Sequence, residues 1–186
     1  MKIILIRHAQ TPGNLEKRYI GKTDEPLSEY GKQELSLRTY PECEAVFVSP
    51  MRRCIQTADI IYPQTPHIIC TQLRECDFGD FEQKNHKELS ESPSYQAWLQ
   101  SGGTAPFPNG ENPASFKVRC TQAFASVIAA NSEKSCIAFV VHGGTIMSVM
   151  EAYARPRLRY FDYMVPNCRG YLTEFNGEFL TVTEKL

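Results

Sequence analysis

Two of the four histidines in this chain come directly after runs of apolar residues that are typical of strands. These are His8 and His142, and each is followed by small or turn-forming residues. In an open α/β sheet the carboxyl ends of parallel strands face one crevice, so two such histidines can enter the same pocket. We expect one to act as a nucleophile and the other to stabilise charge. His67 and His86 lack this setting and are predicted to be surface or packing residues.

The loop around His8 carries further groups that suit a phosphate ester. Arg7 precedes the histidine, and Thr11 and Asn14 follow it within a few residues. An arginine contacts phosphate oxygens through its planar guanidinium group, while threonine and asparagine donate hydrogen bonds without adding charge. This combination predicts a phosphate-binding loop.

A second cationic segment follows the apolar residues 45–48 and begins a helix. It contains Arg52 and Arg53, and the first turn of such a helix directs backbone N–H groups at the same crevice. Neighbouring residues on a helix lie about 100° apart, so only one of the two arginines can face the crevice. Helical spacing alone does not decide which.

Residues 73–82 form a cluster of carboxylates after the third apolar run, and Glu75 is the candidate general acid. A carboxyl group among phosphate oxygens has its charged form disfavoured, which raises its pKa towards a useful range. The other acidic residues are expected to be solvated or paired with arginines. After His142, Gly143 and Gly144 allow close approach of the backbone and present N–H donors to an oxyanion.

The elements that position these residues alternate between strands and helices. Strands are predicted at residues 3–6, 45–48, 67–70 and 136–141, and helices at 29–38, from 51 onwards and at about 114–130. Ser28 is the expected N-cap of the first helix. This order predicts a three-layer αβα sandwich with a mostly parallel central sheet.

Two further segments complete a single domain over residues 1–186. Residues 169–184 alternate like a hairpin with its turn at Asn176-Gly177, and we expect them to add an antiparallel edge. Residues 80–112 are polar and rich in turn signals, which indicates an excursion over one end of the sheet. Such an excursion can act as a lid.

Composition excludes several classes of function. The net charge of -1 gives no global basic field, so neither nucleic acid nor an anionic membrane is an expected partner. The apolar run at residues 3–6 is too short for a signal peptide or a membrane span, and a cytoplasmic protein is expected. Seven cysteines without a C-x-x-C pair indicate reduced thiols rather than a disulfide framework or a zinc site.

Four ordered motifs resemble the histidine phosphatase superfamily, also called phosphoglycerate mutase-like. The family patterns R-H-G-E-T-x-x-N, S-P-L-x-R-A-x-Q-T-A, L-x-E-x-x-F-G-x-W-E-G and H-G correspond here to residues 7–14, 49–58, 73–83 and 142–143. The resemblance covers nearly the whole chain. It implies a small-molecule phosphate ester as partner, no metal and no cofactor, and it leaves a homodimer possible.

Carried over by position, the resemblance also implies roles for individual residues. His8 would become phosphorylated, and Glu75 would protonate the leaving group and later activate water. The family pattern aligns with Arg53 rather than with Arg52. The phosphate would be held by Arg7, Asn14, Arg53, His142 and the Gly143 amide.

The chain departs from the family pattern at four positions, none of which removes a proposed chemical group. Ala9 and Phe81 replace the usual glycine and tryptophan, Gln10 replaces a glutamate, and Gln83 replaces the glycine after Glu82. Ala9 would crowd its loop if its φ were positive. Gln10 removes a negative charge near the phosphate, which predicts altered affinity or pH dependence.

Within the superfamily, the short length and the middle stretch resemble the α-ribazole phosphatases of cobalamin nucleotide-loop assembly. Trp98 and its aromatic neighbours would either stack a flat base or form the core of the excursion. Other possible substrate-binding residues are Thr11, Gly21 and Glu82. The alternatives are a broad sugar-phosphate phosphatase, a phosphoglycerate mutase and, less favoured, a non-catalytic module that binds a phosphorylated ligand.

Overall fold

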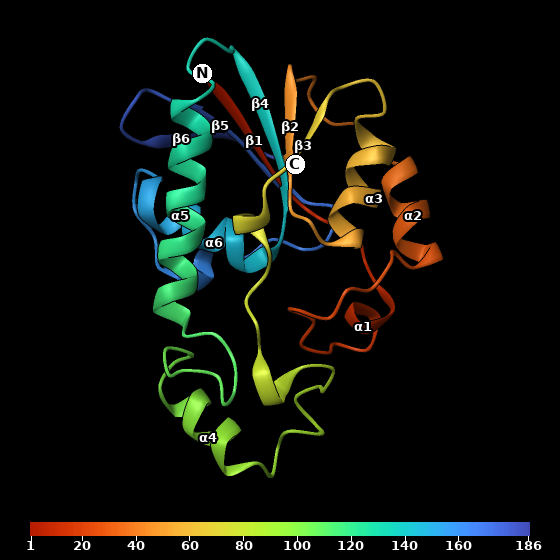
Figure 1. Ribbon diagram of the computed structural model, residues 1–186, viewed down its shortest axis with the longest axis vertical. Helices are drawn as coiled ribbons and strands as arrows, with labels where there is room; N and C mark the ends of the chain where they lie inside the picture. The colour runs from red at the N-terminus through yellow and green to blue at the C-terminus, as the bar shows by residue number, and fades with distance from the viewer.

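A six-stranded sheet lies between two layers of helices in the computed structural model, which describes residues 1–186 (Figure 1). The strands are β1 (Lys2–Arg7), β2 (Ala45–Val48), β3 (His67–Ile69), β4 (Cys136–Val141), β5 (Gly170–Phe175) and β6 (Leu180–Lys185). Their order is β3-β2-β4-β1-β5-β6, with parallel pairing from β3 to β1 and antiparallel pairing beyond β1. The predicted αβα sandwich is confirmed.

The helices cover both faces of this sheet. They are α1 (Pro12–Leu15), α2 (Glu29–Ser36), α3 (Arg52–Ile61), α4 (Pro93–Gln100), α5 (Pro113–Ala129) and α6 (Gly143–Tyr153), with 3₁₀ turns η1 (Thr71–Leu73), η2 (Gly79–Phe81) and η3 (Tyr160–Tyr163). Figure 1 shows α2 and α3 on one side and α5 and α6 on the other. None of the helices is long and apolar enough to span a membrane.

The central strands are apolar at every position because both of their faces are covered. In β1, Ile4 and Ile6 belong to the cluster that packs against α3, whereas Ile3 and Leu5 belong to the cluster that includes residues of α5 and α6. Alternate side chains of a strand point to opposite faces, so a continuous apolar run satisfies both layers. Burial on both faces fixes β1 and β4 at the centre of the molecule.

Local signals account for some of the element ends. The Oγ of Ser28 accepts a hydrogen bond from the Gly31 N–H at 3.0 Å, which is the predicted N-cap. Helix α2 ends at Ser36, two residues before the predicted end. The tail forms the predicted hairpin, in which Gly177 has a φ of 104° and the Asn176 side chain accepts the N–H of Phe179 at 2.9 Å.

The excursion between the third strand and α5 projects beyond the carboxyl ends of the parallel strands, with α4 at its far end (Figure 1). Its interior is an aromatic cluster that includes Phe81, Tyr95 and Phe107 and that packs against Phe116 of α5. This cluster stabilises a wall on the side of the sheet where β1 and β4 end.

Candidate active site

The register between β1 and β4 places the two strand-exit histidines side by side. Arg7 pairs with Val141, and the His8 N–H donates to the Val141 carbonyl at 2.9 Å. The chain then leaves both strands together, so the His8 and His142 rings lie with centroids 5.1 Å apart at 68°. The two rings are therefore neighbours at the ends of their strands, although of the two only His8 lines the cavity described below.

His8 is buried and held in one tautomer. Its Nδ1–H donates to the Ala9 carbonyl oxygen at 2.7 Å, which leaves the lone pair on Nε2. Burial, reinforced by the positive charges of Arg53 and Arg7, lowers the pKa of His8 well below its ordinary value. The imidazole is therefore neutral near pH 7, as a nucleophile must be.

His142 is held by the connection between β2 and α3. Its Nε2 shares a hydrogen bond with the Ser49 Oγ at 2.7 Å, and the Cys54 Sγ lies 3.5 Å from the same nitrogen. Burial and the nearby charge of Arg53 lower the pKa of His142 well below its ordinary value. The site thus contains two neutral imidazoles rather than two cations.

Two arginines supply the positive charge, and each retains an unused donor. Arg7 donates to the Val165 carbonyl at 2.8 Å, and Arg53 donates to the carbonyls of Thr23 and Gly21, each at 2.8 Å. The Nε–H groups of Arg7 and Arg53 are buried and have no partner. Buried unpaired donors are costly, so this arrangement is suited to an incoming anion.

The structure also separates the two adjacent arginines of α3, as helical spacing requires. Arg53 is fully buried on the inner face of the helix. Arg52 is exposed, and its backbone N–H donates to Asp24 at 2.7 Å. Arg53 therefore lies with the histidines.

The carboxylate of Glu75 is fixed at the N-terminus of α6. One oxygen accepts the Cys76 N–H at 2.9 Å, and the other accepts the Gly144 N–H at 3.2 Å. Burial raises the pKa of Glu75, although the two N–H groups and the arginines act in the opposite direction. A carboxyl group with a raised pKa is suited to proton transfer near neutral pH.

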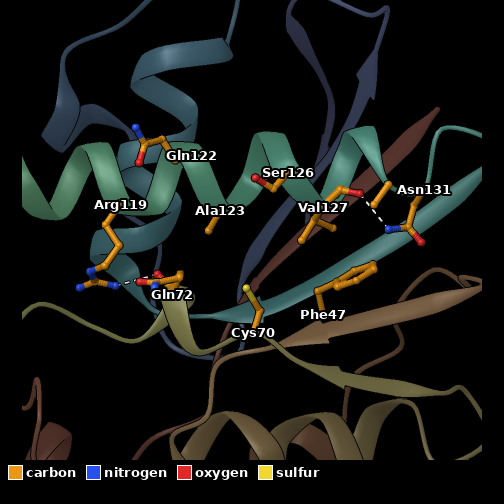
Figure 2. Close-up of a pocket in the computed structure, with 10 residues that line it drawn as sticks. Phe47, Cys70, Gln72, Arg119, Gln122, Ala123, Ser126, Val127 and Asn131 are labelled. Carbon is orange, nitrogen blue, oxygen red and sulfur yellow. Dashed lines mark hydrogen bonds between the residues drawn. The ribbon is translucent and has the colours of Figure 1, made fainter.

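The main chain that carries Glu75 is held by hydrogen bonds from Arg119 of α5. Arg119 donates to the carbonyls of Gln72 at 2.7 Å and Arg74 at 3.0 Å, while Glu111 holds its guanidinium group at 2.9 and 2.7 Å. Figure 2 shows Arg119 directed from α5 towards Gln72. Both residues line a groove of about 510 Å³. No histidine or carboxylate lines this groove. The groove therefore contributes to the site only through Arg119, which supports the main chain next to Glu75.

A cavity of about 650 Å³ opens in front of His8 and Glu75. Arg7, Asn14 and Gly143 also line it, together with aromatic residues from the excursion and from η3. The excursion and η3 contribute Phe78, Trp98, Phe107, Tyr160 and Phe161, and Tyr19 from the loop after α1 and Phe116 from α5 complete the aromatic set. The cavity therefore joins a polar catalytic end to a largely aromatic wall.

Trp98 fits both interpretations drawn from the sequence. It lines the cavity, and it also stacks on Tyr95 with ring centroids 5.9 Å apart at 16°. The indole is thus both part of the excursion's interior and part of the cavity wall.

Five residues expected at the phosphate or the substrate lie outside the cavity wall, namely Arg53, His142, Thr11, Gly21 and Glu82. Arg53 and His142 are fully buried. Thr11 is fully buried as the N-cap of α1, where its hydroxyl accepts the Asn14 N–H at 3.3 Å. Glu82 accepts main-chain N–H groups, including those of Gly21 at 3.0 Å and Lys22 at 2.9 Å. Glu82 therefore supports the loop whose carbonyls bind Arg53, and Gly21 is part of that loop.

Glycine is required at position 21 by the close approach of two main-chain segments. A Cβ there would lie 1.9 Å from the Cys76 carbonyl oxygen. The loop around Gly21, whose carbonyls accept hydrogen bonds from Arg53, thus directly contacts the segment that contains Glu75 and Cys76.

Asn167 is a site residue that sequence reasoning missed. Its side-chain NH₂ donates to the His8 carbonyl at 2.9 Å and to the Asn14 Oδ1 at 3.1 Å. The residue lies in an irregular segment before β5, where no apolar period or glycine-rich turn marks it. Pro166 before it is the only local signal.

The four departures from the family pattern have simple structural outcomes. Ala9 is fully buried and is not among the residues with positive φ, so it does not strain its loop. Gln83 does have a positive φ of 61°, the conformation that glycine adopts most readily. Phe81 fills the aromatic cluster of the excursion, and the Oε1 of Gln10 is buried without a partner.

No group of three or more histidine, cysteine, aspartate or glutamate side chains is arranged to hold a metal ion. The structure brings to the site the ionisable groups of Arg7, Arg53 and Glu75 and the neutral imidazoles of His8 and His142.

Comparison with known proteins places this geometry in a family. The model of the histidine phosphatase superfamily (branch 1) matches residues 3–184. An adenosylcobalamin/alpha-ribazole phosphatase of Salmonella typhi is 27% identical over 190 residues, which is 93% of this chain and 94% of the relative. A protein of the same name from Salmonella typhimurium (strain LT2) is 30% identical over 154 residues, 78% of this chain and 76% of the relative.

A solved structure agrees over almost the whole chain. The alpha-ribazole phosphatase from Shigella flexneri superposes with a TM-score of 0.84 at 26% identity, covering 98% of this chain and 94% of that one. The chain therefore belongs to the histidine phosphatase superfamily, branch 1, and is a phosphatase.

Proposed function

We propose that the protein hydrolyses α-ribazole 5′-phosphate by way of a covalent phosphohistidine on His8. The observation that carries the mechanism is the state of His8, which is neutral, buried and free at Nε2. Beside it, Arg7 and Arg53 each have a buried Nε–H without a partner.

The phosphate would be bound before the reaction by these two arginines, by His142 and by the Gly143 N–H at the start of α6. Asn14 lies in the same cavity wall and is oriented by Asn167. Donors that are already fixed in a buried site stabilise the charge that develops on the phosphoryl oxygens without reorganising.

In the first step, the Nε2 lone pair of His8 forms a bond to phosphorus while the bond from phosphorus to the ester oxygen breaks. Glu75 donates its proton to the departing oxygen, so the alcohol leaves neutral. In the second step, a water molecule attacks phosphorus and gives a proton to the Glu75 carboxylate. The N–P bond breaks, and His8 and Glu75 return to their starting states with inorganic phosphate as product.

The wider cavity supports a leaving group that contains a flat ring. A volume of about 650 Å³ is in the range of small-molecule sites, and its wall includes Trp98 and Phe107. The names of the Salmonella and Shigella relatives support α-ribazole phosphate in particular. An aromatic base stacked on this wall would be held by area burial and ring contacts.

The test is release of inorganic phosphate from α-ribazole 5′-phosphate, 3-phosphoglycerate, fructose bisphosphate and p-nitrophenyl phosphate, each with and without EDTA. We expect the highest kcat/KM for α-ribazole 5′-phosphate, no effect of EDTA, and no turnover by His8→Ala. His86→Ala, which changes an exposed histidine, is the matched control.

Other results would change the assignment. A preference for sugar phosphates would contradict the substrate but not the phosphohistidine. Conversion of 3-phosphoglycerate to 2-phosphoglycerate without phosphate release would indicate a mutase. Loss of activity in EDTA that a divalent metal restores would contradict the mechanism.

A further inference from the structure

An ion pair inside the cavity has no part in the chemistry described above. The Lys117 Nζ on α5 donates to the Glu151 Oε2 on α6 at 2.7 Å, and it lies 3.9 Å from the centre of the Tyr160 ring. All three residues line the cavity that contains His8. The side chains of Lys117 and Glu151 remain 34% and 24% exposed, so both are accessible to a ligand in that cavity.

This pair lies on the side of the site where the alcohol departs. The Tyr160 hydroxyl donates to the Gly144 carbonyl at 3.3 Å, and the N–H of the same Gly144 donates to Glu75 at 3.2 Å. A short series of contacts therefore links the general acid to Lys117.

The pair has unused hydrogen-bonding capacity of both kinds. The hydrogen bond of Glu151 uses only Oε2, which leaves Oε1 as an acceptor. The Lys117 ammonium has three N–H donors and directs one at Glu151. A group that both donates and accepts, such as one of two adjacent hydroxyls, matches this arrangement.

The same arrangement disfavours a carboxylate. The positive charge of Lys117 is already neutralised by Glu151, which would repel a second anion. Two other cations of the cavity wall also contact carboxylates, because Arg18 contacts Glu88 at 2.7 Å and Arg159 contacts Asp162 at 3.2 Å. The Arg159 side chain is 91% exposed, so solvent screens its pair. Beyond the phosphate end, the partly buried cations Lys117 and Arg18 are thus both paired with a glutamate.

We propose that Lys117 and Glu151 form a hydroxyl-binding subsite that recognises a vicinal diol on the leaving group, as in a ribofuranose, and that rejects carboxylates. The inference rests on the proposed function because it takes the cavity as the place of the leaving group. It adds two specificity residues and a class of ligand.

The experiment measures the ratio of kcat/KM for a ribonucleoside 5′-phosphate to that for its 2′,3′-dideoxy analogue. Two matched pairs are used, one built on α-ribazole and one on adenosine. The wild-type ratio is expected to be at least about tenfold, mainly through KM, because the diol contacts charged groups. Glu151→Gln keeps the contact with Lys117 but loses the second acceptor, so the ratio should fall several-fold while the Lys117 donors remain.

A gain of activity provides the second measurement. Glu151→Gln frees the Lys117 charge, so hydrolysis of 3-phosphoglycerate should rise several-fold relative to the ribonucleoside phosphate. Glu29→Gln in α2 is the control, because Glu29 forms an ion pair of the same 2.7 Å length with Lys32 on the exposed surface. The control should change neither ratio.

The outcomes separate this proposal from the proposed function. If α-ribazole 5′-phosphate is a poor substrate but the adenosine pair shows the ratio, the named substrate is wrong and the subsite stands. Equal kcat/KM for ribo and dideoxy substrates in both pairs would overturn the subsite even if phosphatase activity is high. An unchanged ratio in Glu151→Gln would overturn it as well.

Discussion

Replacement of Glu75 by glutamine tests the step that most depends on the tertiary structure. The change keeps the size of the side chain but removes the transferable proton. It also alters the hydrogen bonds, because both carboxylate oxygens accept an N–H, from Cys76 at 2.9 Å and from Gly144 at 3.2 Å. A glutamine can accept only one of them.

The expected loss of stability is modest. One hydrogen bond to a charged group contributes about 1.5–3 kcal/mol, and the variant no longer buries a carboxylate, which offsets part of this. We expect the free energy of unfolding to fall by about 1–2 kcal/mol, so the variant stays folded. Urea denaturation followed by circular dichroism measures this directly.

The expected loss of rate is large and depends on the leaving group. General acid catalysis contributes roughly 10²–10⁴-fold, so hydrolysis of an alkyl phosphate should slow by about that factor. The rate of p-nitrophenolate release, which needs little assistance from a proton donor, should fall by less than about tenfold. Glu91→Gln on the exposed part of the excursion is the matched control.

The pH dependence gives an independent measurement on the same variant. An acid must be protonated to act, and burial raises the pKa of Glu75, so activity should persist above the ordinary glutamate range and fall as pH rises through the raised value. That alkaline limb should disappear in Glu75→Gln. Equal slowing of alkyl and p-nitrophenyl substrates, with the alkaline limb retained, would refute the role of Glu75 as acid.

Two further predictions concern stability. Burial lowers the pKa of His142, so below about pH 6.5 the unfolded chain binds a proton that the native protein does not. This difference lowers the free energy of unfolding by about 1.4 kcal/mol for each pH unit as pH falls. Urea titrations of His142→Gln from pH 6.5 downwards should show a shallower loss of stability than wild type by that slope, and parallel curves would contradict the assignment of a neutral, buried imidazole. Gln83 has a φ of 61°, so Gln83→Gly should raise the free energy of unfolding by about 0.5–1 kcal/mol, whereas Gln33→Gly within α2 should lower it by about 1 kcal/mol. Destabilisation by both glycines would show that the backbone at position 83 is not strained.

The fold was largely readable from the sequence because its signals are local. Continuous apolar runs marked the buried strands, and the Asn176-Gly177 turn marked the terminal hairpin. Element ends were less exact: α2 stops at Ser36, and β3 ends at Ile69 rather than at residue 70. Such ends depend on fine balances of capping and edge pairing that propensity does not resolve.

The sequence by itself determined where the reactive groups leave the sheet. His8 and His142 follow buried strands, and the order of the motifs pointed to Arg53 and Glu75. The prediction for the two histidines follows from local pattern, because the end of an apolar run fixes the end of a strand and thus the edge of the sheet at which a side chain emerges. The choice of Arg53 over Arg52 came from the resemblance to the family, because helical spacing alone left it open.

Only the tertiary structure decided how those groups are held and what surrounds them. It assigned Glu82 to the loop that supports Arg53, brought Asn167 to the carbonyl of His8, and assembled Lys117 and Glu151 in one cavity wall. Such contacts join residues far apart in the chain through irregular segments and separate helices. No periodicity in the sequence records them, because each depends on how whole elements pack against one another.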